Sequence, residues 1–164
     1  MTGAPATCGV EPGDALTGDG IGDLRVGAPV EEVSRSCRVL SDAIVPGVEG
    51  ISERLLLVDL GRDTVRAVVT EGRIGRVHVR GRAYRAADSL GVGTPASALR
   101  RPGARVLTGE GTVFVALPGH CGLSFRIRGV PPGRASSPEQ IPDTALVDEV
   151  LAFGCRVGRS DRAR

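Results

Sequence analysis

A hexapeptide that occurs twice is the strongest constraint on the fold of this 164-residue chain. Residues 24–29 (LRVGAP) recur as residues 90–95 (LGVGTP), with Leu, Val, Gly and Pro in the same positions. Each copy opens a short helical pattern, and strand-like segments follow each of them. The sequence therefore predicts two copies of one helix-plus-sheet unit, each too small to bury a core alone.

The helix of the first unit begins at Pro29, which suits a first helical turn because its missing N–H is not needed there. Apolar residues then follow at spacings of three, four and three up to Leu40, and they predict a helix over about 29–38. Residues 41–52 contain Pro46, Gly47 and Gly50 and are expected to form a loop. Three strands are expected after it, over residues 55–60, 64–70 and 73–80.

The second unit has Thr94 as a helix N-cap and a short helix that ends before Pro102. Strands are expected over residues 104–108, 112–117 and 123–128, followed by a long loop over 129–143. Residues 146–153 fit either a helix or a strand, and we favour a strand. The turn-rich segment 18–22 lacks the Lys-Ser/Thr ending of a phosphate-binding loop, so we interpret it as a tight turn before a short strand.

These elements predict an α+β fold: a tandem repeat of a short helix followed by an antiparallel β-meander, with the helices packed on one face of the sheet. Residues 1–18 are expected to form an irregular N-terminal arm. Residues 19–157 would be a single domain of two repeats, 19–82 and 83–157. Residues 158–164 would be a flexible tail.

Composition and charge narrow the classes of partner. The chain has no Trp, one Tyr, three Phe and a formal net charge of +2. Stacking platforms for single strands need several aromatic rings, and long-range steering needs a larger charge, so we expect no nucleic-acid partner. No apolar run reaches the length of a transmembrane helix, and no apolar signal segment is visible at the start.

The four cysteines indicate the cellular compartment in which the protein is found. An even number in a small chain is typical of an oxidising environment, so we favour a secreted or periplasmic protein in its trimmed mature form over a cytosolic one. If residues 122–128 and 146–154 are antiparallel neighbours, Cys121 lies near Cys155, which leaves Cys8 with Cys37. Three connectivities are possible, and a reduced core thiol at Cys37 or a lipid-bearing Cys8 stays open.

Catalytic and metal chemistry find little support in the sequence. Cys121 would need a neighbouring base, but His120 would point to the opposite face of a strand, which leaves His78 as the other candidate. Two histidines and four scattered cysteines without a C-x-x-C spacing do not form a recognisable metal site. We therefore expect no metal and no cofactor.

One face of the expected sheet carries basic and polar side chains. Alternation along the strands places these side chains opposite the apolar ones. If the strands share a sheet, this face is either an ordinary solvated surface or a contact surface for an acidic protein or an anionic envelope polymer. Arginine suits the second function because its planar guanidinium binds carboxylates through two hydrogen bonds. The candidate residues are Arg66, Arg76, His78, Arg80, Ser124, Arg126 and Arg128.

The segments GAPVEEV (27–33) and GTPASAL (93–99) support a family comparison. Each segment, followed by a meander, resembles the helix-plus-sheet repeat of β-lactamase inhibitory proteins. It is also similar to the small outer-membrane-assembly lipoproteins built on one such unit. The resemblance implies a non-enzymatic, extracytoplasmic binding module, although no inhibitory residue of that family carries over.

The sequence thus favours a binding module that presents an arginine-rich sheet face. Two alternatives remain: a small cysteine-dependent hydrolase using Cys121 and a histidine, and a purely structural envelope domain. The oligomeric state is left open.

Overall fold

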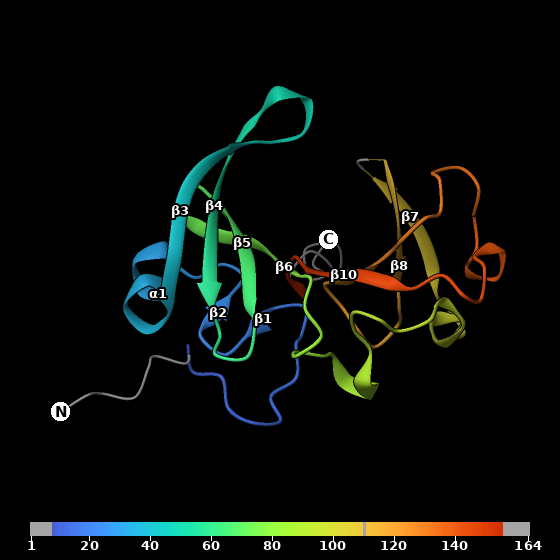
Figure 1. The fold of residues 1–164 in the computed structure, drawn as a ribbon, viewed down its shortest axis with the longest axis horizontal. Coiled ribbons are helices and arrows are strands. Elements are labelled where there is room, and N and C mark those ends of the chain that lie inside the picture. The colour runs from blue at the N-terminus through green and yellow to red at the C-terminus, as the bar shows by residue number, and fades with distance from the viewer. Residues whose placement is uncertain (1–7, 110, 156–164) are drawn as a thin grey trace, which may run out of the picture.

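The computed structural model describes residues 8–109 and 111–155, and a single curved sheet dominates this part of the chain (Figure 1). Eight antiparallel strands lie in the order β3-β4-β5-β6-β10-β9-β8-β7. Strands β3 to β5 stand on one side of the picture and β7 and β8 on the other, with β6 and β10 between them. The strands are β3 (Arg38–Pro46), β4 (Ser52–Asp59), β5 (Thr64–Thr70), β6 (Arg73–Val79), β7 (Arg105–Gly109), β8 (Thr112–Ala116), β9 (Leu123–Ile127) and β10 (Val147–Ala152).

Smaller elements complete the described chain. The helix α1 (Val30–Ser36) follows Pro29 and turns Val30 and Val33 into the core. Its first turn is acidic and its last turn basic, which is the arrangement that stabilises a helix dipole. None of the described helices is both long and apolar enough to cross a membrane. The remaining elements are β1 (Gly20–Ile21), β2 (Leu24–Arg25) and 3₁₀ turns at Val48–Gly50, Ala87–Ser89, Ala96–Leu99 and Pro138–Gln140.

The core lies on one face of the sheet and is almost wholly aliphatic. Alternate side chains of each strand turn inward, as the pleat requires, and Phe125 is the largest of the fully buried ones. Cys8 and Leu16 are also buried, so the N-terminal arm is anchored to the domain at these two residues, while residues 11–15 between them are exposed. Residues 1–7 of that arm and the expected tail lie outside the described residues.

The predicted α+β tandem repeat is wrong. The described residues contain one eight-stranded sheet and a single α-helix, and no second helix-plus-sheet unit follows the first. The helix expected after Pro95 is a 3₁₀ turn of four residues, Ala96–Leu99. Only six residues separate Pro95 from Pro102, and a helix this short gains too few hydrogen bonds to offset the cost of its first turn.

The recurring hexapeptide is instead a local backbone motif. The Gly27 N–H donates to the Ile74 carbonyl of β6 at 2.7 Å, and the Gly93 N–H donates to the Val147 carbonyl of β10 at 2.7 Å. Both glycines have φ near +90°, a conformation that a side chain disfavours. The identical residues of the two hexapeptides therefore reflect the same backbone contact with a central strand. The segments that follow the two hexapeptides fold differently.

The loop expected over residues 41–52 is also wrong, because most of it belongs to β3 and to the turn after it. A β-bulge at Leu40 shifts the pairing between Val39 and Ser41, and this shift breaks the alternation that would have revealed the strand. The β3–β4 hairpin extends beyond the rest of the sheet (Figure 1). Ile44 and Ile51 near its end are largely exposed.

The C-terminal strand and both cysteine pairs agree with the sequence predictions. Strand β10 pairs antiparallel with β9, with Val150 opposite Phe125. This pairing brings Cys121 and Cys155 together in a disulfide with Cα atoms 5.1 Å apart. Cys8 and Cys37 form the second disulfide, with Cα atoms 4.1 Å apart. Two disulfides in a chain of this size are typical of a protein from an oxidising compartment.

Candidate binding face

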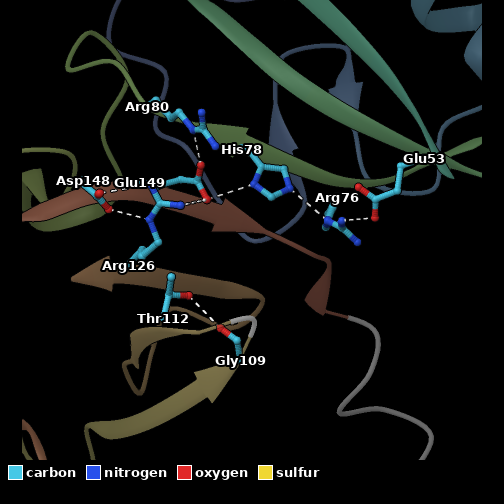
Figure 2. A network of polar contacts seen from close by, with 9 residues as sticks. All are labelled: Glu53, Arg76, His78, Arg80, Gly109, Thr112, Arg126, Asp148 and Glu149. Carbon is cyan, nitrogen blue, oxygen red and sulfur yellow. Dashed lines mark hydrogen bonds and ion pairs between the residues drawn. The ribbon is translucent and has the colours of Figure 1, made fainter. Parts of the chain in front are cut away.

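The face of the sheet turned away from the core carries the charged residues and is called here the charged face. Cross-strand register places Arg66 on β5 directly opposite His78 on β6. Residues that face each other in this way project from the same side of a sheet. Arg80 follows β6, Arg126 lies on β9, and Glu53 of β4 and Glu149 of β10 lie on the same face (Figure 2). Together with Arg66, they show that five strands, β4, β5, β6, β10 and β9, contribute to the charged face.

A β-bulge in β10 gives this face its acidic centre. Val147 pairs with Ile127 and Glu149 pairs with Arg126, so Asp148 is an extra residue on the bulged strand. Two residues at such a bulge can project from the same side of the sheet, which regular alternation forbids. Both carboxylates consequently reach Arg126.

Glu149 is the most buried charged group of the face. Only 3% of its side chain is exposed. Its Oε1 lies 3.1 Å from Nδ1 of His78 and 3.6 Å from a guanidinium nitrogen of Arg126, and Nε of Arg80 donates to its Oε2 at 2.5 Å. Burial raises the pKa of Glu149, but the hydrogen bonds from His78 and Arg80 and the charge of Arg126 outweigh it and hold the pKa at about 2, below the ordinary 4.5. Glu149 is therefore ionised at neutral pH.

The hydrogen bonds fix the tautomer of His78. Nε of Arg76 always carries a proton, and it lies 3.0 Å from Nε2 of His78, so Nε2 must accept. The ring proton then sits on Nδ1 and is donated to Glu149. Arg76 is in turn held by Glu53 of β4 at 2.6 Å. His78 thus connects two ion pairs through its two ring nitrogens.

Arg126 makes a bidentate contact with the second acidic residue of the bulge. Its Nε and Nη2 donate to the two carboxylate oxygens of Asp148 at 2.7 and 3.1 Å. This fork-to-fork geometry is the strong form of the arginine–carboxylate pair. The hydrogen bond with Asp148 raises the pKa of Arg126 above its ordinary value.

The remaining two arginines of the charged face differ from these. Arg66 and Arg128 are exposed, and within residues 8–109 and 111–155 neither guanidinium contacts a carboxylate. Arg66 lines two adjoining hollows of about 420 and 340 Å³ together with His78 and Arg80. Arg128 lines a third hollow of about 380 Å³ beside Arg126 and Asp148.

The structure thus divides the seven predicted surface residues into three groups. Arg76, His78, Arg80 and Arg126 are engaged by internal carboxylates, whereas Arg66 and Arg128 are not. Ser124 lies opposite Leu151 of β10, which separates it from His78, and only 4% of Ser124 is exposed.

Sequence reasoning missed the acidic half of this face: Glu53, Asp148 and Glu149. A signal for it exists in the sequence. The segment VDEVLA is apolar apart from two adjacent acids. Regular alternation would turn one of these acids into the core, so the pair favours a bulge, and a buried acid also needs a cationic partner.

The cysteine-dependent hydrolase has no support in the site geometry. Cys121 is bonded to Cys155 and has no thiol to act as a nucleophile. His120 packs edge-on against Phe125, with ring centroids 6.3 Å apart, and its Nε2 lies 3.6 Å from Asp88. Among the described residues, no group of three His, Cys, Asp or Glu side chains is arranged to hold a metal ion.

Comparison with known proteins gives a likeness of fold. No protein-family model matches the chain, and a search of curated proteins gives no match either. The chain is similar to the crystal structure of the uncharacterized protein yfeY from Escherichia coli, with a TM-score of 0.65 and 19% sequence identity. The match covers 85% of this chain and 99% of the other. At this identity the likeness concerns the fold alone.

Proposed function

We propose that the protein is a non-enzymatic, extracytoplasmic binding module that presents its charged face to an acidic protein segment. The observation that carries the proposal is the contrast among the arginines: Arg66 and Arg128 are exposed without an internal carboxylate, while their neighbours are paired. The two disulfides support a secreted or periplasmic location.

The paired arginines indicate the chemistry that the face prefers. Arg76, Arg80 and Arg126 all contact carboxylates, one of them through a bidentate fork. A guanidinium of the same face without such a partner offers the same planar donor set to a carboxylate from outside. Because the internal pairs already neutralise most of the face, the external ligand meets two separate cations rather than a broad basic patch.

The spacing of these two cations favours an extended protein segment. Arg66 lies on β5 and Arg128 follows β9, with β6 and β10 between them. Three inter-strand spacings amount to about 14 Å across the sheet. The register places Arg66 level with Ser124, so Arg128 lies about 13 Å further along the strand direction. The two positions are therefore roughly 19 Å apart, which an extended chain spans in about six residues. An acidic segment with carboxylates about six residues apart can therefore contact both arginines.

Fluorescence anisotropy with a labelled, extended Glu-containing peptide tests this function. We expect the double variant R66Q/R128Q to bind at least about tenfold more weakly, since a hydrogen bond to a charged group contributes about 1.5–3 kcal/mol. The matched control is R25Q/R35Q, which removes the same charge from β2 and α1. Control binding should stay within about twofold of wild type.

Three results would contradict the proposal. An equal loss in both double variants would show that only net charge matters. Stronger binding to a polyuronate than to the peptide would favour the anionic envelope polymer as the partner. Absence of binding to either probe would leave a purely structural domain.

A further inference from the structure

The hollow beneath the β3–β4 hairpin combines an apolar wall with an unpaired cation. The end of β3 at Val45 forms one side, and Leu55 of β4 and Val68 of β5 form the apolar floor. Val68 is directly opposite both Leu55 and Arg76, so the apolar and basic groups face the same space. The volume of about 420 Å³ falls within the range of small-molecule sites.

We propose that this hollow binds a carboxylate carried on a short aliphatic chain, with Arg66 as the residue that holds the carboxylate. This inference rests on the proposed function and names the chemistry of one of its two contact points. The aliphatic chain would lie against Val45, Leu55 and Val68. The carboxylate could belong to a small fatty acid or to the C-terminal residue of a peptide.

Charge balance in the hollow selects a monoanion. Three arginines line the hollow, but Glu53 neutralises Arg76 and Glu149 neutralises Arg80. Arg66 is the one guanidinium of this hollow that contacts no carboxylate within the described residues. A phosphate dianion would place a second negative charge near Glu53 and Glu149 without a second cation to balance it. A single carboxylate matches the single guanidinium.

The position of Arg66 explains how it can reach a ligand. The smaller adjoining hollow is also lined by Leu57, Asp63 and Thr64. It shares Arg66, His78 and Arg80 with the larger one. Arg66 therefore lines both spaces, and its side chain is exposed to solvent. Its flexible side chain can turn toward the hairpin without breaking an internal ion pair, which is not true of Arg76 or Arg80.

Titration calorimetry with hexanoate tests the inference, with hexylamine, acetate and inorganic phosphate as comparison ligands. We expect hexanoate to bind more tightly than acetate, because its chain buries apolar area, and hexylamine and phosphate to show no binding. R66Q should weaken hexanoate binding by about 10- to 100-fold. The matched control R35Q on α1 should leave binding unchanged.

A second variant and a second ligand make the test decisive. V45S should weaken hexanoate binding while leaving acetate binding unchanged, because it alters only the apolar wall. An acetylated dipeptide ending in a free leucine carboxylate should compete with hexanoate, and its C-terminal amide should not. Competition by this dipeptide would identify a peptide terminus as one source of the carboxylate.

The inference is overturned if wild-type protein does not bind hexanoate, or if R66Q binds it as wild type does. If the acidic peptide binds through Arg66 and Arg128 but hexanoate does not bind, the proposed function is retained. The hollow is then rejected as a site for an aliphatic carboxylate. Failure of both the peptide and hexanoate would reject both proposals.

Discussion

Glu149 shows how a single buried carboxylate organises the charged face. It contacts His78, Arg80 and Arg126 from three directions while only 3% of its side chain is exposed. A buried charge of this kind is tolerated only when its partners surround it. If the charge of Glu149 is lost, the positive charges of Arg80 and Arg126 are less fully neutralised.

We predict that Glu149→Gln lowers the free energy of unfolding by about 3 kcal/mol, since removing one partner of a buried ion pair costs about 3–5 kcal/mol. Urea denaturation measures this value. The control is Glu53→Gln. The Glu53 side chain is 29% exposed, so the loss of its charge should cost no more than about 1 kcal/mol. Equal losses in the two variants would contradict the central role of Glu149.

Glu149 also predicts a dependence of stability on pH. Its pKa is about 2 in the folded protein and 4.5 in its ordinary state, so its stabilising effect is fully present above pH 4.5. The effect is lost as the pH falls from 4.5 toward 2, and the total loss is about 3 kcal/mol. Unfolding of wild type and Glu149→Gln should therefore converge in this range. Parallel pH profiles would show that Glu149 is not the group responsible.

At the residue scale, the sequence predicted the basic residues better than their partners. Alternation within 73–80 and 123–128 was enough to place His78 and Arg126 on one face. The acids come from elements where alternation fails or was not recognised: the bulge places Asp148 and Glu149 together, and Glu53 precedes the strand expected to start at residue 55. The sequence alone therefore could not separate the basic residues that pair with an internal carboxylate from those that do not.

Among the elements, strands with regular patterns and distinct turns were predictable. Strands β5 and β6 lie close to their expected bounds, and the two residues between them, Glu71 and Gly72, both have positive φ. Strand β3 was missed because its bulge and its exposed side chains remove the apolar alternation. Edge strands gain their stability from backbone pairing with one neighbour, and that pairing leaves little trace in the sequence.

The two disulfides are predicted to differ in how much they stabilise these elements. Each closes a loop of about 30 residues, for which chain entropy alone gives about 3–4 kcal/mol. Cys8 and Cys37 are buried, so the C8A/C37A variant also creates a cavity, whereas Cys121 is exposed. Thermal unfolding should show a lower Tm for C8A/C37A than for C121A/C155A. The reverse order of Tm values would mean that the Cys121–Cys155 disulfide stabilises the fold more than the Cys8–Cys37 disulfide does.

On the scale of the whole molecule, one continuous sheet replaces the two separate units that the repeat predicted. Strand β10 joins β6 of the first half to β9 of the second, so both halves share hydrogen bonds as well as a core. Matching hexapeptides could not reveal this, because strand order depends on pairing between segments that lie far apart in the chain. The positive-φ glycines that make the hexapeptides alike are a local property.

This sheet order predicts a gradient of local stability. Amides of the central strands β6 and β10 should exchange with deuterium most slowly, because they are paired on both sides and flank the buried core. Amides of residues 44–52 at the end of the β3–β4 hairpin should exchange fastest among the strand residues. If the hairpin amides exchanged as slowly as those of β6 and β10, the result would contradict the position of the hairpin at a free edge of the sheet.

Nuclear magnetic resonance with ¹⁵N-labelled protein, titrated with an acidic peptide, tests the proposed contact face most directly. We predict that the Nε–Hε signals of Arg66 and Arg128 shift, together with backbone amides of β5 and β9, while α1 stays unchanged. Shifts confined to another surface, such as the groove between residues 10–15 and 83–89, would contradict the assignment of the charged face. The absence of any shift at saturating peptide would contradict the binding function itself.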